Sequence, residues 1–175
     1  MPDRLHRQPL HAAAACWPGT GARGALVLPL PAVATVPLPP ALDLGGRRFE
    51  RKAEFHLTLL AAREWRQARM ALGEAAVRAL FEALDWRLEG DGRYFRVQRG
   101  PAETIILDLH APAAAAFRRG LAAAGVALPA ATPHLTLFWH GDPVGIGISG
   151  PQQWRQRVRE RLAIDWPAAR AAPAE

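Results

Sequence analysis

The tetrapeptide His-Leu-Thr-Leu occurs twice in this chain, at residues 56–59 and 134–137. A random chain of the same composition would contain roughly 0.003 copies, so the two copies form an internal repeat. Both lie in apolar surroundings, at 55–60 and 133–138, that favour β-strands. The fold of this chain must therefore accommodate two similar strands, one in each half of the sequence.

Side chains of a strand point alternately to its two faces, so the histidine and the threonine of each copy share one face and the leucines share the other. If the two strands meet about a pseudo-twofold axis, two imidazoles and two hydroxyls converge on one cleft. Two histidines can act as general base and general acid in cleavage of a phosphodiester. Threonine hydroxyls can hydrogen-bond the non-bridging phosphate oxygens. The candidate catalytic residues are therefore His56, Thr58, His134 and Thr136.

Two other interpretations of the repeat explain less. Half-buried core histidines, each hydrogen-bonded to a threonine, would account for one copy, but packing does not require the same polar pair at two places. A zinc site needs a further ligand, which His110 or His140 could supply. The zinc interpretation is therefore the weaker one.

The two copies resemble the His-x-Thr-x signatures of the 2H phosphoesterase superfamily, which includes the 2′-5′ RNA ligase-like and RNA 2′,3′-cyclic phosphodiesterase proteins. The resemblance extends over residues 25–163. It implies a bilobed, pseudo-twofold α+β fold with mostly antiparallel sheets, with the motifs on facing central strands and the helices outside. It also implies an enzyme without metal or cofactor that opens a 2′,3′-cyclic phosphate, or a related 2′-5′ or cyclic phosphodiester, on an RNA end or a nucleotide. A non-catalytic RNA- or nucleotide-binding module on the same fold is the alternative.

Four further residues are candidates for substrate binding: Lys52, Phe138, Tyr94 and His140. Lys52 ends a basic run before the first motif and shares the face of His56 if that strand continues backwards. Phe138 and His140 continue the alternation of the second motif. Phe138 and Tyr94, together with Trp139, could stack on a base. A solvated loop for Lys52, core packing for the aromatic residues and a surface position for His140 are the alternatives.

The composition is compatible with a polyanionic partner but does not demand one. The net charge is +6 and the pI about 11.1, which suits phosphate-rich ligands. Lys52, however, is the only lysine, and the abundance of Ala, Pro and Gly also fits a coding bias. Cys16 is the only cysteine, so no intrachain disulfide can form. The lack of disulfides favours a cytoplasmic location. With no run of about 18 apolar residues we expect no transmembrane helix and no membrane partner, and we expect a monomer.

We expect one domain over residues 25–163, with loosely ordered ends at 1–24 and 167–175. Glycine and proline divide the chain between them into short elements. The pattern predicts strands at 25–30, 48–60, 86–89, 93–98, 104–109, 134–139 and 144–149, a hairpin turn at 90–92, and helices at 63–84 (interrupted at Gly73), 112–124 and 151–163.

Overall fold

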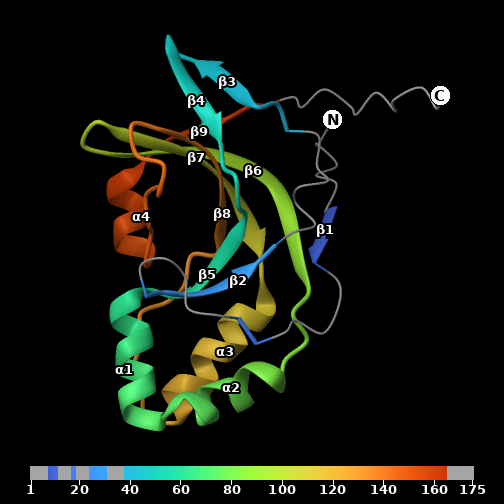
Figure 1. Cartoon of the computed structure of the whole chain (residues 1–175), viewed down its shortest axis with the longest axis vertical. Coiled ribbons are helices and arrows are strands. Elements are labelled where there is room, and N and C mark those ends of the chain that lie inside the picture. Colours follow the sequence, from blue (N-terminus) through green and yellow to red (C-terminus); the bar gives the residue numbers. More distant parts are fainter. Residues whose placement is uncertain (1–7, 12–16, 19–23, 31–37, 165–175) are drawn as a thin grey trace, which may run out of the picture.

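The computed structural model describes residues 8–11, 17–18, 24–30 and 38–164. Within these ranges nine strands form one antiparallel sheet accompanied by four helices, which confirms the expected α+β class (Figure 1). No helix in the described part of the chain has the length and apolar character needed to cross a membrane. The elements are β1 (Gln8–His11), β2 (Leu26–Pro29), β3 (Ala41–Leu44), β4 (Arg47–Arg51), β5 (His56–Leu60), α1 (Ala62–Leu72), α2 (Glu74–Glu82), β6 (Leu88–Arg99), β7 (Ala102–His110), α3 (Pro112–Ala123), β8 (His134–His140), α4 (Pro151–Arg157) and β9 (Val158–Leu162).

The strand β8 is the branch point of the sheet. The main path runs β1-β6-β7-β8-β4-β3, while β9 pairs with β6, and β5 pairs with both β8 and β2. The C-terminal half of β8 pairs with β4 through Trp139 and Phe138, and its N-terminal part meets β5 at Leu135. In Figure 1 α1, α2 and α3 gather at one end of the molecule, and the β3–β4 hairpin extends from the other.

The two faces of the sheet carry different cores. The larger core joins the leucines of β5 and β8 to Trp65 of α1, Phe81 of α2 and Phe117 of α3. The smaller core lies on Ile106 of β7 and is covered by Ile146 and Ile148 of the loop after β8. Residues 102–107 of β7 are all buried, as expected for a strand covered on both faces.

Several sequence-based assignments are confirmed along the helices. Gly73 separates α1 from α2 and has a φ of 78°, a value that favours glycine. The helix α3 begins at Pro112, and Gly125 follows its end with a φ of 94°.

Other assignments are wrong, and each for a local reason. The signal at 90–92 is a bulge within the continuous strand β6, where the Asp91 side chain accepts the Arg93 N–H at 2.9 Å. The segment 144–149 is a loop, and the expected helix at 151–163 is the short α4 followed by β9. The predicted strand at 48–60 is two strands, and β3–β4 turns at Gly45 and Gly46.

The ends of the chain are only partly covered by the structure. A short strand, β1, lies within the segment 1–24 that we expected to be loosely ordered, and it pairs with β6. Residues 167–175 lie outside the described ranges, as does most of the Pro-rich passage before β3.

Candidate active site

Pairing of β5 with β8 brings the two copies of the repeat together. The two strands are antiparallel, and Leu57 is the register partner of Leu135. Both leucines are buried in the larger core. One residue to either side of this pair, the antiparallel register sets His56 across from Thr136 and Thr58 across from His134. All four polar side chains therefore lie on the face opposite the leucines, and each histidine has a threonine as its cross-strand neighbour.

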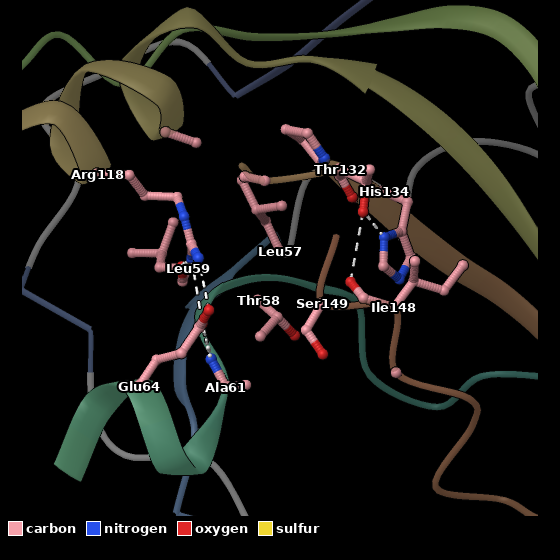
Figure 2. Close-up of a pocket in the computed structure, with 14 residues that line it drawn as sticks. Leu57, Thr58, Leu59, Ala61, Glu64, Arg118, Thr132, His134, Ile148 and Ser149 are labelled. Atoms are coloured by element: carbon pink, nitrogen blue, oxygen red, sulfur yellow. Dashed lines mark hydrogen bonds and ion pairs between the residues drawn. The ribbon is translucent and has the colours of Figure 1, made fainter. Parts of the chain in front are cut away.

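The ring of His134 has a defined orientation and tautomer. Its Nδ1–H donates to the carbonyl oxygen of Thr132 at 2.8 Å, and since a carbonyl can only accept, the proton is on Nδ1 (Figure 2). Nε2 is left for a ligand. Burial lowers the pKa of His134, the Thr132 hydrogen bond opposes this by raising it, and the nearby His56 lowers it further. The ring is therefore neutral at pH 7 and can accept a proton at Nε2.

The second imidazole, His56, lies beside the only lysine of the chain. Burial lowers the pKa of His56, and the charge of Lys52 lowers it further, while Glu54 opposes both. Lys52 does not lie on β5, because the strand begins at His56. Instead its backbone N–H donates to the Leu137 carbonyl at 2.8 Å, and Nζ donates to the Pro143 carbonyl at 2.5 Å. The lysine thus comes near the motif from the segment between β4 and β5, not by strand alternation.

A β-bulge in β8 changes which side chains follow the second motif. Thr136 pairs with Ile106 but Phe138 pairs with Ile105, so Leu137 and Phe138 both point into the larger core. Phe138 is 0% exposed and therefore does not contact a substrate. The prediction that Phe138 and His140 share the face of the candidate catalytic residues is wrong, since it assumed unbroken alternation.

Of the other ring-bearing candidates, His140 and Trp139 also lie on different faces of the sheet from those that alternation predicts. The ring of His140 lies 5.6 Å from that of Phe49, on the core side, and its Nδ1–H donates to the Arg48 carbonyl at 2.9 Å. Tyr94 pairs with Leu107 and packs, partly buried, against the larger core on the face of the sheet away from His134, and its binding of substrate stays a prediction. Trp139, which pairs with Thr104, is the aromatic residue of β8 that returns to the face of Thr136.

A pocket opens beside the paired motifs, between β5, the segment before β8 and the loop after it (Figure 2). Thr58 and His134 line one part of it, and Thr132, Gly147 and Ser149 line another. Sequence analysis identified none of these last three: it assigned Gly147 and Ser149 to a strand at 144–149, and Thr132 lies outside the predicted elements. Alternating glycines at 145 and 147 were the available signal of an irregular loop.

The loop after β8 approaches the motif closely at Gly145. A Cβ on this residue would lie 3.5 Å from Cγ2 of Thr136, and the φ of Gly145 is 87°. The loop thus covers the threonine of the second motif at van der Waals distance, and a side chain at Gly145 would strain the backbone because of its positive φ.

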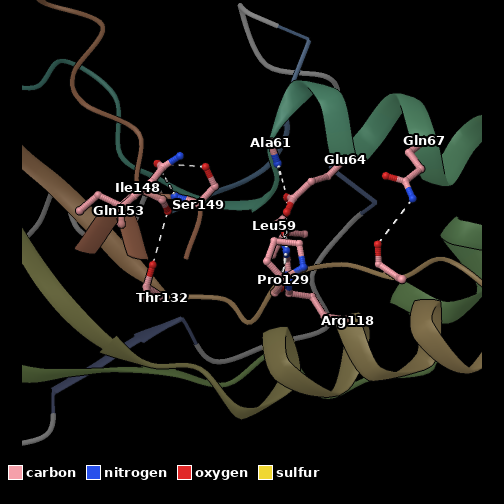
Figure 3. Close-up of polar contacts among 11 residues, drawn as sticks. Leu59, Ala61, Glu64, Gln67, Arg118, Pro129, Thr132, Ile148, Ser149 and Gln153 are labelled. Atoms are coloured by element: carbon pink, nitrogen blue, oxygen red, sulfur yellow. Dashed lines mark hydrogen bonds and ion pairs between the residues drawn. The ribbon is translucent and has the colours of Figure 1, made fainter. Parts of the chain in front are cut away.

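An ion pair in the pocket lining supports the segments next to the two motifs (Figure 3). Arg118 of α3 pairs with Glu64 of α1 at 2.6 Å, and both side chains are almost completely buried. The same guanidinium donates to the Leu59 carbonyl at 2.8 Å and to the Pro129 carbonyl at 2.9 Å. It therefore ties the residue after Thr58 to the segment that leads into β8.

Asp108 lies across from His134 on the other neighbouring strand, β7. Its carboxylate accepts a hydrogen bond from Arg93 at 2.6 Å, and Arg93 also pairs with Asp91. Burial, followed by the charge of Asp91, raises the pKa of Asp108 to about 6, while Arg93 opposes the increase. A partly titrating carboxyl thus flanks the histidine at neutral pH.

The described residues contain no group of three or more His, Cys, Asp or Glu side chains placed to hold a metal ion. His110 is exposed at the end of β7, and His140 lies on the core side of the sheet. Neither joins the histidines of the repeat.

Comparison with known proteins gives no relative from which the chemistry could be transferred. No protein-family model, no curated protein and no solved structure matches this chain. The chemistry of the site is therefore inferred from its own side chains. These are two imidazoles with lowered pKa values, two threonine hydroxyls and a nearby ammonium group on one face of β5 and β8.

Proposed function

We propose that this protein is a phosphoesterase of the 2H type. Its substrate would be a 2′,3′-cyclic phosphate, or a related 2′-5′ or cyclic phosphodiester, on an RNA end or a nucleotide. The observation that carries the proposal is the antiparallel pairing at Leu57 and Leu135, which gives each histidine a threonine of the other motif as its neighbour. The local twofold relation of the motifs is also what a pseudo-twofold, bilobed 2H fold would require.

In this mechanism one neutral imidazole removes a proton from water as the water oxygen attacks phosphorus. The bond between phosphorus and the leaving sugar oxygen breaks. The other imidazole, which is protonated when the substrate is bound, gives its proton to that oxygen. Hydroxyls of Thr58 and Thr136 donate to the non-bridging oxygens, where negative charge accumulates. Proton exchange with solvent restores the two histidines.

The electrostatics of the site suit a negatively charged substrate. In the free protein burial favours neutral rings at both histidines. A bound phosphodiester brings a negative charge between them and raises the pKa of the imidazole that must act as acid. The ammonium group of Lys52 is near enough to shift the pKa of His56 and can attract the same anion.

The test is turnover of 2′,3′-cyclic nucleotides, cyclic-ended RNA and 2′-5′ oligonucleotides in the presence of a chelator. His56→Ala and His134→Ala should each lower kcat by about 10²- to 10⁴-fold. The double variant should lose much less than the product of the two factors, because the histidines act as a unit. His110→Ala, at an exposed position outside the site, is the matched control and should retain full activity.

Absence of turnover on every substrate, or activity that survives in the double variant, would refute the proposal. Salt-dependent binding of RNA without product would favour the non-catalytic binding module instead.

A further inference from the structure

Ser149, the only serine of the chain, has a hydroxyl whose donor direction is fixed by its surroundings. Three groups converge on Oε1 of Gln153. They are the N–H and Oγ of Ser149, at 3.1 and 3.2 Å (Figure 3), and Nη1 of Arg157, at 2.9 Å. A backbone N–H and a guanidinium can only donate, so the atom at their meeting point must be the amide oxygen. The Ser149 hydroxyl therefore donates its proton to Gln153.

Because its proton is used in the hydrogen bond to Gln153, the Ser149 hydroxyl can only accept a hydrogen bond from a ligand in the pocket. Thr132 is in a similar position, since its hydroxyl donates to the Ile148 carbonyl at 3.4 Å, a long hydrogen bond. Thr58 differs, because within the described residues no hydrogen bond uses its hydroxyl, and the residue is exposed. The pocket thus has a donor hydroxyl at Thr58 and acceptor oxygens at Ser149 and Thr132.

The rest of the lining is small, apolar or already paired. Its apolar members include Leu57, Leu59, Ala61, Ala114 and Ala131. Arg118 and Glu64 also line the pocket but neutralise each other in their ion pair. Acceptor oxygens without a free charge do not favour a second anion. They suit an uncharged group that donates hydrogen bonds from a compact carbon frame, as a sugar hydroxyl does.

We propose that Ser149 accepts a hydrogen bond from a sugar hydroxyl of the substrate and so makes this pocket a subsite for the sugar next to the reacting phosphate. The inference rests on the proposed function, because the phosphate is placed at the histidines and threonines. The sugar is covalently joined to that phosphate, and the pocket begins at Thr58 and His134. Ser149 would thus determine specificity without taking part in proton transfer.

The experiment is calorimetric titration of the protein with uridine 3′-monophosphate and with its 2′-deoxy and 5′-deoxy analogues. For the wild type, at least one missing hydroxyl should weaken binding roughly fivefold to tenfold. In Ser149→Ala this difference should disappear, because the acceptor is gone. In Ser149→Thr, which keeps a hydroxyl, it should persist, and this variant guards against a folding defect in the alanine variant.

Equal binding of all three nucleotides to the wild type would overturn the inference, as would no measurable binding or a hydroxyl preference that survives in Ser149→Ala. Turnover by the wild type with no effect of Ser149 on hydroxyl preference would refute the subsite alone. A preference that depends on Ser149 without turnover would refute the proposed catalysis but leave the subsite standing.

Discussion

The charge of Lys52 acts on His56 although the two residues belong to different segments. This ammonium group disfavours the protonated imidazole and so lowers the pKa of His56. Lys52→Met should therefore raise the pKa of His56, which NMR titration of the imidazole carbon-bound protons would measure. Arg66→Met, on the exposed face of α1, removes a cation of equal charge away from the motif and should leave that pKa unchanged. An unchanged or lower pKa of His56 in Lys52→Met would contradict this coupling.

Asp108 should make the stability of the protein depend on pH in a distinctive direction. Its pKa rises from 3.8 to about 6 in the folded state, so between these values the folded chain holds more protons than the unfolded chain. The contribution of this group to the free energy of unfolding therefore falls as pH rises through that window. Asp108→Asn removes the titration. Relative to wild type, the variant should gain on the order of 1 kcal/mol between pH 4 and pH 7.5, discounted for solvent screening.

Urea unfolding at the two pH values would measure the gain. Asp43→Asn, an exposed change on β3, is the matched control. If the free energy of unfolding of Asp108→Asn did not rise relative to that of wild type between the two pH values, the assignment would be contradicted.

At single positions, the sequence was informative where strand alternation is unbroken. It correctly separated His56 and Thr58 from the leucines of their motif, because burial of one face leaves a period of two in the residues. It could not find Ser149, whose relation to Thr58 comes from a loop packed across the sheet. It predicted that Lys52 lies near His56, but for the wrong reason, because it assumed that the strand continues back from His56. Lys52 is instead held by hydrogen bonds to the carbonyls of Pro143 and Leu137, and such contacts leave no local pattern in the sequence.

Helices and strands were predicted well where a single residue determines their ends. They were predicted poorly where pairing with another strand determines their ends. Gly73 and Pro112 mark helix boundaries that were visible in the sequence. Gly-Asp-Gly at 90–92 has the composition of a turn, but pairing with β7 resumes at Tyr94 and turns the signal into a bulge. The bulge in β8 is invisible for the same reason, because it exists only relative to β7.

The ion pair between α1 and α3 should be among the more important stabilising contacts of the molecule. Arg118→Met would leave Glu64 buried without its cation and the Leu59 and Pro129 carbonyls without this donor. We expect a loss of about 3 kcal/mol in the free energy of unfolding, measured by urea denaturation. Arg119→Met, an exposed change on the same helix, should alter stability by no more than about 0.5 kcal/mol. Equal losses in the two variants would show that the ion pair contributes little.

Across the whole molecule, the sheet assembles the site from two distant parts of the sequence. The repeat predicted that the two parts would meet, and the antiparallel α+β class followed from the short elements and their turns. The branched path through β8 was not predictable, since β4 and β5 pair with successive parts of the same strand. Such pairing depends on the total packing of both cores and not on any local stretch.

The strand β8 pairs over a longer stretch with β7 than with β5, and this difference affects the order in which parts of the protein unfold. Register with β7 extends from Asp108–His134 to Glu103–His140, whereas among the described residues β5 meets β8 at the Leu57–Leu135 pair alone. Regions with fewer shared hydrogen bonds open at a lower free energy than the rest. Amides of β5 and β2 should therefore exchange with deuterium before those of β7 and β8. In rising denaturant the proposed activity should then be lost while the circular dichroism of the protein still reports a nearly intact sheet.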